Sequence, residues 1–431
     1  MCGYESPAWF GRCPSCSEWN SAVVFNSELD SQDYHEKPMA ESRALSEIDT
    51  VENSRSSSGI QEFDRSIGGG IVPGSAVLIS GEPGIGKSTF MLQLSAGIAK
   101  EKPVLYVSGE ESPRQLKLRA DRLGLKNQQN IKIVAATDIT FLRNEDLSGY
   151  GLLVFDSLQT LKLSDVPSLP GSVVQVRECA NFLVSSAKSS EVPVFIVSHV
   201  TKGGLIAGPK LVEHLVDTVL YFEASKTGYR FLRTVKNRFG PSDEIAVFEM
   251  TSAGLIEIPD ISSLFVEDYV SAPGNVIAAI SEGSRTFLVE VQALVSKPIY
   301  GTPRRLSTGI PVERVLLVAA VLTKRAGMPL DSLDLYVNVA GGIQIEDTGA
   351  DLAVAAALIS SFTDTVIPDN LTLVGEIGLD GTVRSVSSTE KRIERAKSSP
   401  FNRIVSPEGE NPLADVRQLV KMIGGIRNGK K

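Results

Sequence analysis

The amino-acid sequence predicts an α/β protein: a first large domain built on a mostly parallel, twisted sheet, followed by an α+β domain. Three observations predict this. A glycine-rich loop, GEPGIGKST, lies between a strand pattern and a helix pattern. Short apolar strand patterns then alternate with helix patterns, as in a parallel doubly wound sheet. From about Ser262 apolar and polar residues alternate instead, which indicates half-buried strands of a second domain.

Length and composition set broad limits on the class of protein. The chain has 431 residues, enough for two or three domains, with 42% hydrophobic and 22% charged residues. No apolar run approaches the ~18 residues of a membrane span and no secretory signal opens the chain, so we expect a cytoplasmic protein without a membrane partner. The net charge of −8 means that nucleic-acid binding would depend on local basic loops.

The loop GEPGIGKST fits the phosphate-binding pattern G-x-x-x-x-G-K-[ST] at every fixed position. Its glycines let several backbone N–H groups converge on one anion. Lys87 can reach the β- and γ-phosphates of ATP, and the Ser88 hydroxyl can hold Mg²⁺. The strand pattern Ala76–Ser80 precedes the loop, and the helix pattern Phe90–Lys100 follows it with its N-terminus facing the phosphates. The predicted nucleotide-binding residues of the loop are Gly81, Glu82, Pro83, Gly84, Ile85, Gly86, Lys87, Ser88 and Thr89.

Carboxylates follow two of the apolar strand patterns. Glu110 and Glu111 come after Pro103–Ser108, where a carboxylate can orient and activate a water molecule. Either glutamate also fits an N-terminal charge for the helix that begins near Ser112, and we favour Glu110 as the base because of its strand-end position. The run LLVFD ends in Asp156, which we expect in the Mg²⁺ shell as the Walker B acid.

Later strand patterns end in His199 and in basic residues. His199 lies where a side chain can sense the γ-phosphate, although a satisfied polar residue at a strand end is the alternative. The glycine-rich segment after it offers Lys202 and Lys210 to phosphates. Lys236 and Arg238, in KNRFG, suit cations that reach into the active site of a neighbouring subunit; a solvated basic turn is the alternative.

The first residues carry a cysteine motif. Cys13 and Cys16 form C-P-S-C, a knuckle suited to Zn²⁺, and Cys2 is a third potential ligand. A structural zinc site takes four ligands, and the fourth is expected three residues before Cys2, outside this sequence. We expect a zinc-knuckle remnant over residues 1–26, a polar linker over 27–58, the nucleotide-binding domain over 59–260 and the second domain over 261–431.

Together these motifs resemble those of the bacterial RadA (Sms) DNA-repair ATPases. The similar stretches are the phosphate loop, YVSGEES, FDSLQT, SHVTKGG and KNRFG, in this order behind CPSC. The resemblance implies a RecA-like core that forms a homo-hexameric ring on single-stranded DNA and drives branch migration of recombination intermediates alongside the RecA recombinase. It further implies that Lys87 and Glu110 are catalytic and that the loops around Ser164–Gly171 and Lys202–Gly208 face DNA. Lys236 and Arg238 would act on ATP in trans or couple hydrolysis to DNA movement.

Residues 261–431 resemble the proteolytic domain of Lon, which uses a Ser–Lys dyad. Where Lon-type proteases carry the nucleophilic serine, this chain reads T-G-A-D-L, with Ala350 and Asp351. Without a nucleophile there is no covalent catalysis, so we expect an inactive scaffold that takes part in ring assembly. Arg304 and Arg305 are candidate contacts to DNA phosphates, with a solvated turn as the alternative.

Three functions remain open from the sequence. The first is a DNA-dependent ATPase motor for branch migration. The second is a regulatory ATPase of the RecA fold that acts on protein partners. The third is an ATP-dependent protease, against which the missing serine argues. The fold does not choose among them, because the RecA-type core carries many functions.

Overall fold

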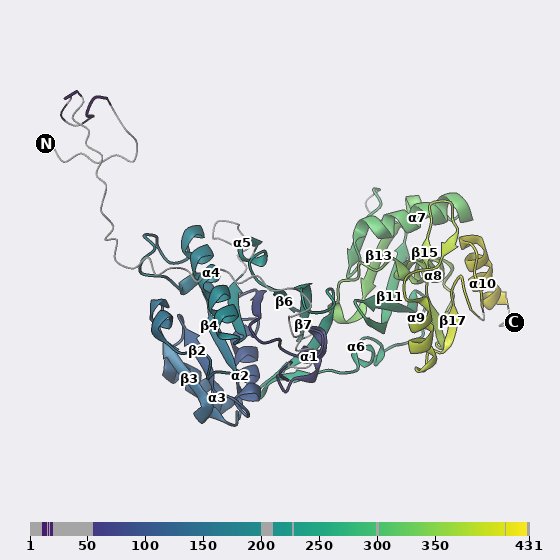
Figure 1. Ribbon diagram of the computed structural model, residues 1–431. Helices are drawn as coiled ribbons and strands as arrows, with labels where there is room; N and C mark the ends of the chain where they lie inside the picture. Colours follow the sequence, from purple (N-terminus) through teal and green to yellow (C-terminus); the bar gives the residue numbers. More distant parts are fainter. Residues whose placement is uncertain are drawn as a thin grey trace, which may run out of the picture. The chain divides into compact units, whose positions relative to one another are not determined.

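The computed structural model divides the chain into two units, Met1–Asn53 and Ser54–Lys431 (Figure 1). It describes residues 11–14, 16, 18–19, 55–199, 210–225, 228–298, 301–409 and 411–428. In the first unit the description is confined to the cysteine knuckle, where the backbone N–H of Cys13 donates to the carbonyl of Glu18 at 2.9 Å and Arg12 pairs with Trp19 as an isolated bridge. No helix of the described residues is long and apolar enough to cross a membrane.

The second unit contains a nine-stranded sheet in the order β3-β2-β4-β5-β1-β6-β7-β8-β9. The first six strands of this order are parallel to one another, and β7 to β9 continue the sheet antiparallel. The strands are β1 (Ala76–Gly81), β2 (Val104–Ser108), β3 (Ile131–Ala135), β4 (Leu152–Asp156), β5 (Val194–His199), β6 (Thr218–Ala224), β7 (Tyr229–Asn237), β8 (Ile245–Thr251) and β9 (Gly254–Glu257).

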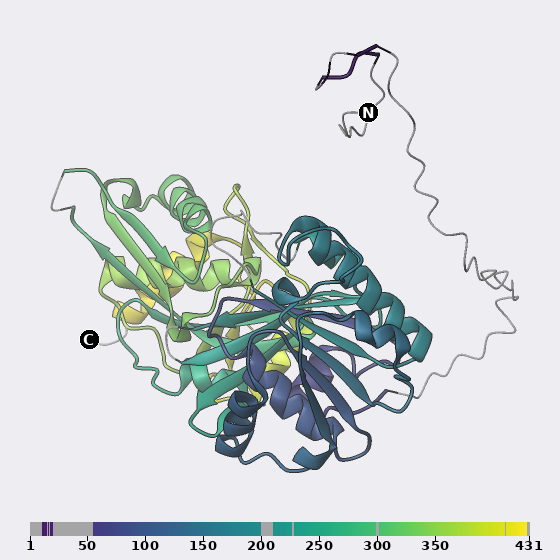
Figure 2. The same ribbon diagram turned by 90° about the vertical axis from the view of Figure 1, so that its left-hand side faces the viewer.

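Helices cover both faces of this sheet (Figures 1 and 2). Side chains of β1 alternate between the faces: Val77 and Ile79 join one apolar cluster, and Ala76 and Leu78 join the other. The first cluster contains side chains of α1, α2 and α3, and the second contains side chains of α4. The helices are α1 (Gln61–Ser66), α2 (Lys87–Ile98), α3 (Pro113–Arg122), α4 (Val173–Ser190) and α5 (Lys210–Glu213).

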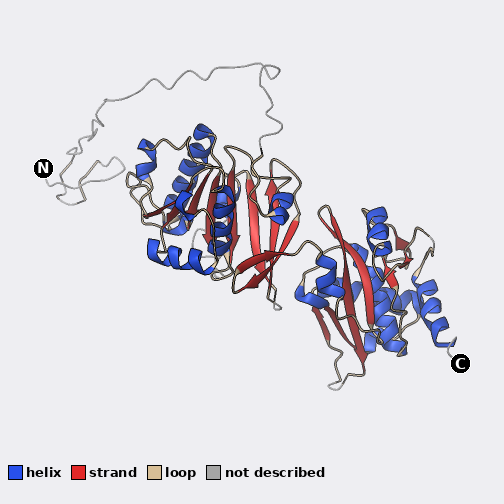
Figure 3. Cartoon of the chain, turned by 90° about the horizontal axis from the view of Figure 1, so that it is seen from below, coloured by secondary structure: helices blue, strands red, loops and turns tan. Residues whose placement is uncertain are grey.

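A six-stranded mixed sheet in the order β12-β13-β11-β10-β14-β17, with a two-stranded β15–β16 ribbon, forms the rest of the unit (Figure 3). The strands are β10 (Asn275–Glu282), β11 (Arg285–Ser296), β12 (Arg305–Thr308), β13 (Asp334–Val339), β14 (Leu371–Leu373), β15 (Glu376–Ile377), β16 (Val383–Arg384) and β17 (Arg403–Val405). The helices are α6 (Ile261–Val266), α7 (Val312–Ala326), α8 (Asp351–Thr363), α9 (Thr389–Lys397) and α10 (Val416–Asn428).

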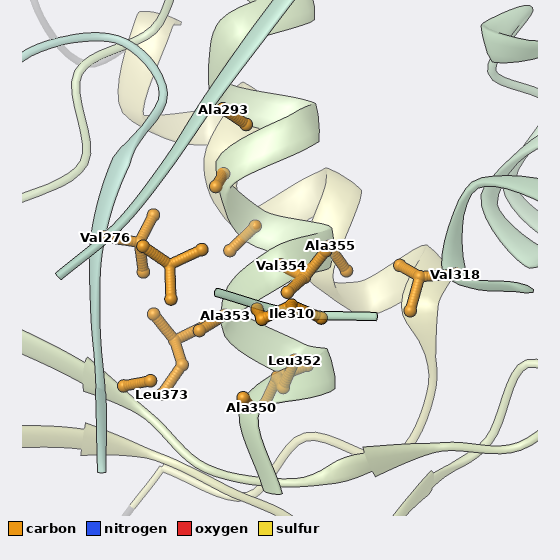
Figure 4. Close-up of a cluster of buried hydrophobic side chains, with 14 of the residues drawn as sticks. Val276, Ala293, Ile310, Val318, Ala350, Leu352, Ala353, Val354, Ala355 and Leu373 are labelled. Atoms are coloured by element: carbon orange, nitrogen blue, oxygen red, sulfur yellow. The ribbon is translucent and has the colours of Figure 1, made fainter. Parts of the chain in front are cut away.

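Helix α8 is the centre of this second core. Its residues from Asp351 to Ser360 are all buried, as an apolar, alanine-rich helix requires. Figure 4 shows Val276, Ala293, Ile310, Val318 and Leu373 arranged around α8. The alanines allow α8 to approach β10 and β11 closely, which explains why a helix of such small residues is buried on all sides.

Candidate nucleotide site

The phosphate-binding loop leaves β1 and enters α2, as the motif predicts. Gly84 and Gly86 have positive φ values of 76° and 119°, a backbone region that favours glycine. A Cβ at Gly81 would lie 2.7 Å from the carbonyl oxygen of Phe222, and one at Gly86 would lie 2.5 Å from the Met250 methyl carbon. These glycines are therefore required both by the curl of the loop and by the packing of β6 and β8 against it.

Lys87 begins α2, and its side chain returns into the loop. Its Nζ donates to the carbonyl of Gly81 at 2.7 Å and to that of Glu82 at 2.9 Å. Burial lowers the pKa of Lys87 to about 8, although Asp156 and Glu110 act in the opposite direction. The two carboxylates thus lie close enough to attract the ammonium group. A cation, a loop of N–H donors and a helix N-terminus are the groups that a triphosphate needs.

Asp156 ends β4 and is buried. One of its oxygens, Oδ2, accepts a hydrogen bond from the hydroxyl of Tyr106 at 2.8 Å. Tyr106 lies on the neighbouring strand β2 and is also fully buried. Burial, and to a smaller extent the negative charge of Asp156, raises the pKa of the Tyr106 hydroxyl. The bond fixes one carboxylate oxygen and leaves the other for Mg²⁺ or its water shell. Tyr106 was not predicted as a residue of the site.

The two glutamates after β2 lie in different surroundings. Glu111 pairs with Arg119 of α3 at 2.6 Å, as a residue at a helix N-terminus commonly does, and burial raises its pKa. Glu110 instead accepts a hydrogen bond from the Ser157 hydroxyl, immediately after Asp156. Its side chain is 43% exposed. Glu110 is therefore the glutamate that is directed toward the Walker B strand and is accessible to water.

His199, at the end of β5, lies beside Glu110. Its Nε2 is 3.2 Å from Glu110 Oε1, yet both ring nitrogens are buried without hydrogen-bond geometry to any described residue. Gln159 holds the backbone of His199: its Nε2 donates to the His199 carbonyl at 3.3 Å and to the Ser198 hydroxyl at 2.7 Å. The imidazole can therefore form a hydrogen bond to a polar group, such as a phosphate oxygen, at this position.

The structure also brings Arg230 to the phosphate loop. Arg230 lies on β7, and its Nε donates to the carbonyl of Ile85 at 2.9 Å. This contact supports the loop from the side of the antiparallel strands. Arg230 was missed because the sequence offers no signal for a single arginine on a strand 145 positions away from its partner.

The KNRFG turn and the phosphate loop lie at opposite ends of the strands of the sheet. Thr218, the first residue of β6, pairs with Asn237 on β7 and with Val77 near the start of β1. The phosphate loop follows Gly81 at the other end of β1, four residues and about 13 Å farther along the strand. The turn and the loop of one chain therefore do not form a common site.

The two cations of the turn differ in availability. The Lys236 ammonium donates to the carbonyls of Glu213 at 2.7 Å and Val216 at 2.8 Å. Burial, and to a smaller extent the positive charge of Arg238, lowers the pKa of Lys236. The Arg238 side chain is 50% exposed and contacts Asp217 at 3.2 Å. Lys236 thus secures the segment after α5, whereas the Arg238 guanidinium is accessible from solvent.

The predicted DNA contacts are only partly described. Lys202 lies outside the described residues, and Lys210 is exposed at the start of α5. In the loop after β4, the buried amide of Gln175 donates to three carbonyls, those of Leu163, Val166 and Ser168, at 3.0–3.1 Å. The side chain of Gln175 therefore holds the backbone of this loop in place.

The two arginines of the second domain also differ. Arg304 is exposed, and its backbone N–H donates to Asp334 at 2.7 Å. The Arg305 guanidinium donates to backbone carbonyls, including those of Leu330 and Asp331, both at 3.0 Å. A DNA phosphate would have to compete with these carbonyls for Arg305. Arg305 therefore does not have the freely hydrated side chain that a solvated turn implies.

At the start of α8, where Lon-type proteases carry the nucleophile, Asp351 is buried and its Oδ1 accepts a hydrogen bond from Arg314 at 2.7 Å. The Thr348 hydroxyl donates to Glu376 at 3.0 Å. Together with Ile310, Asp347 and other residues, Arg314 and Asp351 line a cavity of about 320 Å³. An ion pair occupies the place where a serine nucleophile would be required, in agreement with the sequence.

The zinc ligands cannot be assembled from the described residues. Cys13 is buried and Cys16 exposed, and Cys2 lies outside the described part of the chain. Among the described residues no group of three or more His, Cys, Asp or Glu side chains is placed to hold a metal.

Cys179 is buried in α4, where burial raises the pKa of its thiol to about 12, as expected of a cysteine that acts as a small apolar residue.

Family models and one solved structure match separate parts of the chain. A family model described as KaiC ATPase matches residues 56–146, one described as rubredoxin metal binding domain matches residues 1–23, and one described as subunit ChlI of Mg-chelatase matches residues 312–410. A solved KaiC-like protein from Pyrococcus horikoshii is 26% identical, with a TM-score of 0.40, over 48% of this chain and 99% of its own.

Relatives from several bacteria match nearly the whole chain. DNA repair protein RadA of Halalkalibacterium halodurans is 44% identical, covering 98% of this chain and 94% of that protein. The RadA protein of Bacillus subtilis is 44% identical, covering 94% of this chain and 91% of its own, and that of Listeria monocytogenes is 42% identical, covering 98% and 94%.

The parallel sheet, the phosphate loop and the carboxylates at the ends of β2 and β4 define an ATP-hydrolysing enzyme with a RecA-like core, which confirms the predicted fold class. The chain belongs to the family of bacterial DNA repair proteins named RadA. The resemblance drawn from the motifs is thereby confirmed.

Proposed function

We propose that this protein is a DNA-dependent ATPase of recombinational repair that works as a ring. Its partners are further copies of itself, single-stranded and branched DNA, and the RecA recombinase. The observation that carries the proposal is the distance between the KNRFG turn and the phosphate loop within one chain. An exposed Arg238 that does not reach its own loop suits a head-to-tail assembly, in which each subunit contributes to its neighbour's site. Branch migration would be the work done by such a ring.

Each residue of the site has a role in this proposal. Lys87 neutralises charge on the transferred phosphate, and Ser88 and Asp156 hold Mg²⁺, which supplies further charge stabilisation when it is bound. Glu110 orients the attacking water. Arg238 of the adjacent subunit completes the site as an arginine finger. His199 contacts the γ-phosphate and conveys its loss to the chain that follows β5.

The remaining cations and the cysteines are assigned to binding. Lys202, Lys210, Arg304 and the segment from Ser164 to Gly171 are proposed to contact DNA phosphates, with Arg305 positioning the Arg304 turn. Cys2, Cys13 and Cys16 are proposed zinc ligands, supported by the match of residues 1–23 to a metal-binding domain.

The test is the steady-state rate of ATP hydrolysis with and without single-stranded DNA, with Lys87→Ala as the blank. We expect DNA to stimulate turnover several-fold and the stimulation to weaken as salt rises, because DNA binding by phosphate contacts releases counterions. Equal turnover with and without DNA would contradict the proposal and favour a regulatory ATPase acting on protein partners.

A further inference from the structure

The KNRFG turn packs directly on the segment that follows α1. Asn237 Oδ1 accepts the backbone N–H of Phe239 at 3.0 Å, and Asn237 Nδ2 donates to the carbonyl of Ile67 at 3.1 Å. A Cβ at Gly240 would lie 2.9 Å from Asn237 Nδ2 and 3.2 Å from the Cα of Gly68. The turn and the segment after α1 therefore meet backbone to backbone, with no room for a side chain at Gly240.

Arg55 joins these two segments from a third part of the chain. Its Nη2 donates to the carbonyl of Phe239 at 2.5 Å, and its Nη1 lies 3.3 Å from the Ile67 carbonyl and 3.4 Å from that of Gly70. The next residue, Ser56, pairs with Ile71 through two backbone hydrogen bonds of 2.9 Å. The Ser56–Ile71 pair consequently fixes the backbone next to Arg55, while the Arg55 guanidinium reaches the turn.

The position of Arg238 depends on this arrangement. Its backbone N–H donates to the carbonyl of Asp217 at 3.1 Å, and the residues on either side of it, Asn237 and Phe239, are bound by Ile67 and Arg55 respectively. The backbone is thus fixed before, at and after Arg238. Within the described part of the chain the Arg238 side chain has only the 3.2 Å contact to Asp217, and it is half exposed.

We propose that Arg55 is a positioning residue for catalysis: it fixes the Phe239 carbonyl so that Arg238 is presented in the correct orientation to the nucleotide of the neighbouring subunit. This inference rests on the proposed function, in which Arg238 acts in trans. A guanidinium suits the task because its planar fork of donors serves several carbonyls at once, whereas a lysine ammonium on a flexible stem would hold the turn less rigidly.

The experiment is subunit complementation with the full-length chain, measured as ATP hydrolysis in the presence of single-stranded DNA. Arg55→Ala, Arg238→Ala and Lys87→Ala are each assayed alone, and Arg55→Ala and Arg238→Ala are also assayed in equal mixtures with Lys87→Ala. We expect Arg55→Ala alone to lose turnover several-fold while its affinity for ATP stays unchanged, because Arg55 does not contact the phosphate loop.

Mixing should restore activity. A Lys87→Ala subunit cannot hydrolyse ATP but presents an intact turn, so an Arg55→Ala subunit beside it regains its finger. With random assembly, complementation should give about a quarter of wild-type turnover per subunit plus a quarter of the Arg55→Ala rate, since half of the subunits can hydrolyse ATP and half of these have a competent neighbour on the contributing side of a head-to-tail interface. Without complementation the mixture should show about half of the Arg55→Ala rate, because the Lys87→Ala subunits only dilute it. Lys117→Ala, which removes an exposed ion pair on α3, is the matched control and should keep wild-type turnover.

The outcomes separate the two proposals. If Arg238→Ala is complemented by Lys87→Ala but Arg55→Ala is not, the role of Arg55 is wrong and the action of Arg238 in trans stands. If neither is complemented, the action in trans is wrong. Wild-type turnover of Arg55→Ala alone would also overturn the inference. Should Arg55→Ala fail to fold, Arg55→Lys, which keeps the charge and some donors, takes its place and must show partial loss with complementation.

Discussion

At the scale of single residues, the site is controlled by buried polar groups that lie next to one another on adjacent strands. Lys87, Asp156 and Tyr106 are all buried, and the hydroxyl of Tyr106 binds the carboxylate of Asp156. Burial makes the charge of Lys87 sensitive to pH and makes the orientation of Asp156 depend on one phenol. Two predictions follow from these residues.

The first concerns nucleotide affinity and pH. Burial lowers the pKa of Lys87 to about 8, so its ammonium is charged below pH 8 and loses its proton above it. Since the charged form binds triphosphate, the affinity for ATP should be constant up to about pH 8 and then fall roughly tenfold per pH unit. Binding of a fluorescent ATP analogue between pH 7 and 9.5 measures this. Lys87→Arg, which stays charged, should show no fall, and a flat wild-type profile would contradict the prediction.

The second concerns magnesium. Tyr106→Phe removes the hydroxyl that fixes Asp156 Oδ2 but keeps the ring that packs in the core. Loss of a residue that orients a metal ligand should raise the Mg²⁺ concentration for half-maximal hydrolysis by roughly tenfold. Titration of Mg²⁺ at saturating ATP is the measurement. Tyr269→Phe, whose hydroxyl is 3.4 Å from the Asn275 carbonyl in the other sheet, is the control. An unchanged Mg²⁺ dependence in Tyr106→Phe would show that Asp156 is held by other contacts.

Sequence patterns located most of the site because its chemistry requires particular residue types at strand ends. Glu110, Asp156 and His199 all follow apolar strands and meet at one edge of the sheet, as parallel strands predict. Tyr106 is different: it was placed in a strand, but which partner a buried phenol finds depends on which strand lies beside it. Arg230 and Arg55 depend on contacts between distant segments, which local patterns do not encode.

At the scale of elements, the strand and the helix that flank the phosphate loop were predicted within a few residues, whereas helix α10 (Val416–Asn428) was not predicted. The apolar run LLVFD agrees with β4 (Leu152–Asp156) at both ends. The weakly apolar edge strand β3 and the short strands β12 and β17 were missed, because short segments that pair with only one or two neighbours carry few buried residues. The assignment of domain boundaries and of site roles stays a prediction.

The loop after β4 shows how one side chain can order an element. Gln175 is buried near the start of α4; its Oε1 accepts the N–H of Leu163 at 3.0 Å, and its amide donates to three carbonyls of the loop. Gln175→Leu keeps the approximate volume but leaves these backbone groups without a partner, which should cost about 1–3 kcal/mol.

We therefore expect Gln175→Leu to lower the melting temperature and to speed hydrogen exchange of the Leu163 and Ser168 amides. Hydrogen exchange followed by mass spectrometry on peptides of this loop measures the effect. Gln115→Ala, which removes one half of an exposed capping box on α3, should leave the loop unchanged. Equal protection of the loop in wild type and Gln175→Leu would show that other contacts order it.

At the scale of the whole second unit, a cluster of ion pairs joins the two sheets. Glu62 of α1 accepts two hydrogen bonds from Arg285, at 2.8 and 3.0 Å, and Arg285 stands at the start of β11. Arg65 pairs with Glu62 at 3.3 Å and with Glu244 at 2.7 Å, and Glu244 accepts the backbone N–H of Ser284 at 2.7 Å. Glu62 and Glu244 are buried, so the charges are screened little by salt.

Apolar side chains cross the same boundary. Phe231 and Val247, from the nine-stranded sheet, belong to the apolar cluster that also contains Val276 and Val289 of the six-stranded sheet. Because one core spans both sheets, they should unfold together. Removal of the charged contacts tests whether this coupling depends on the ion pairs or on the apolar cluster alone.

Arg285→Ala leaves the buried Glu62 carboxylate with Arg65 as its remaining charged partner among the described residues, and a lost hydrogen bond to a charged group costs about 1.5–3 kcal/mol. We expect calorimetry to show a single transition for the wild-type chain and two resolved transitions for Arg285→Ala, the lower one shifted down by several degrees. Arg384→Ala, which breaks a pair whose side chains are 59% and 54% exposed, should leave the melting curve unchanged because exposed ion pairs contribute little. One unshifted transition for Arg285→Ala would assign the coupling of the two sheets to the apolar cluster.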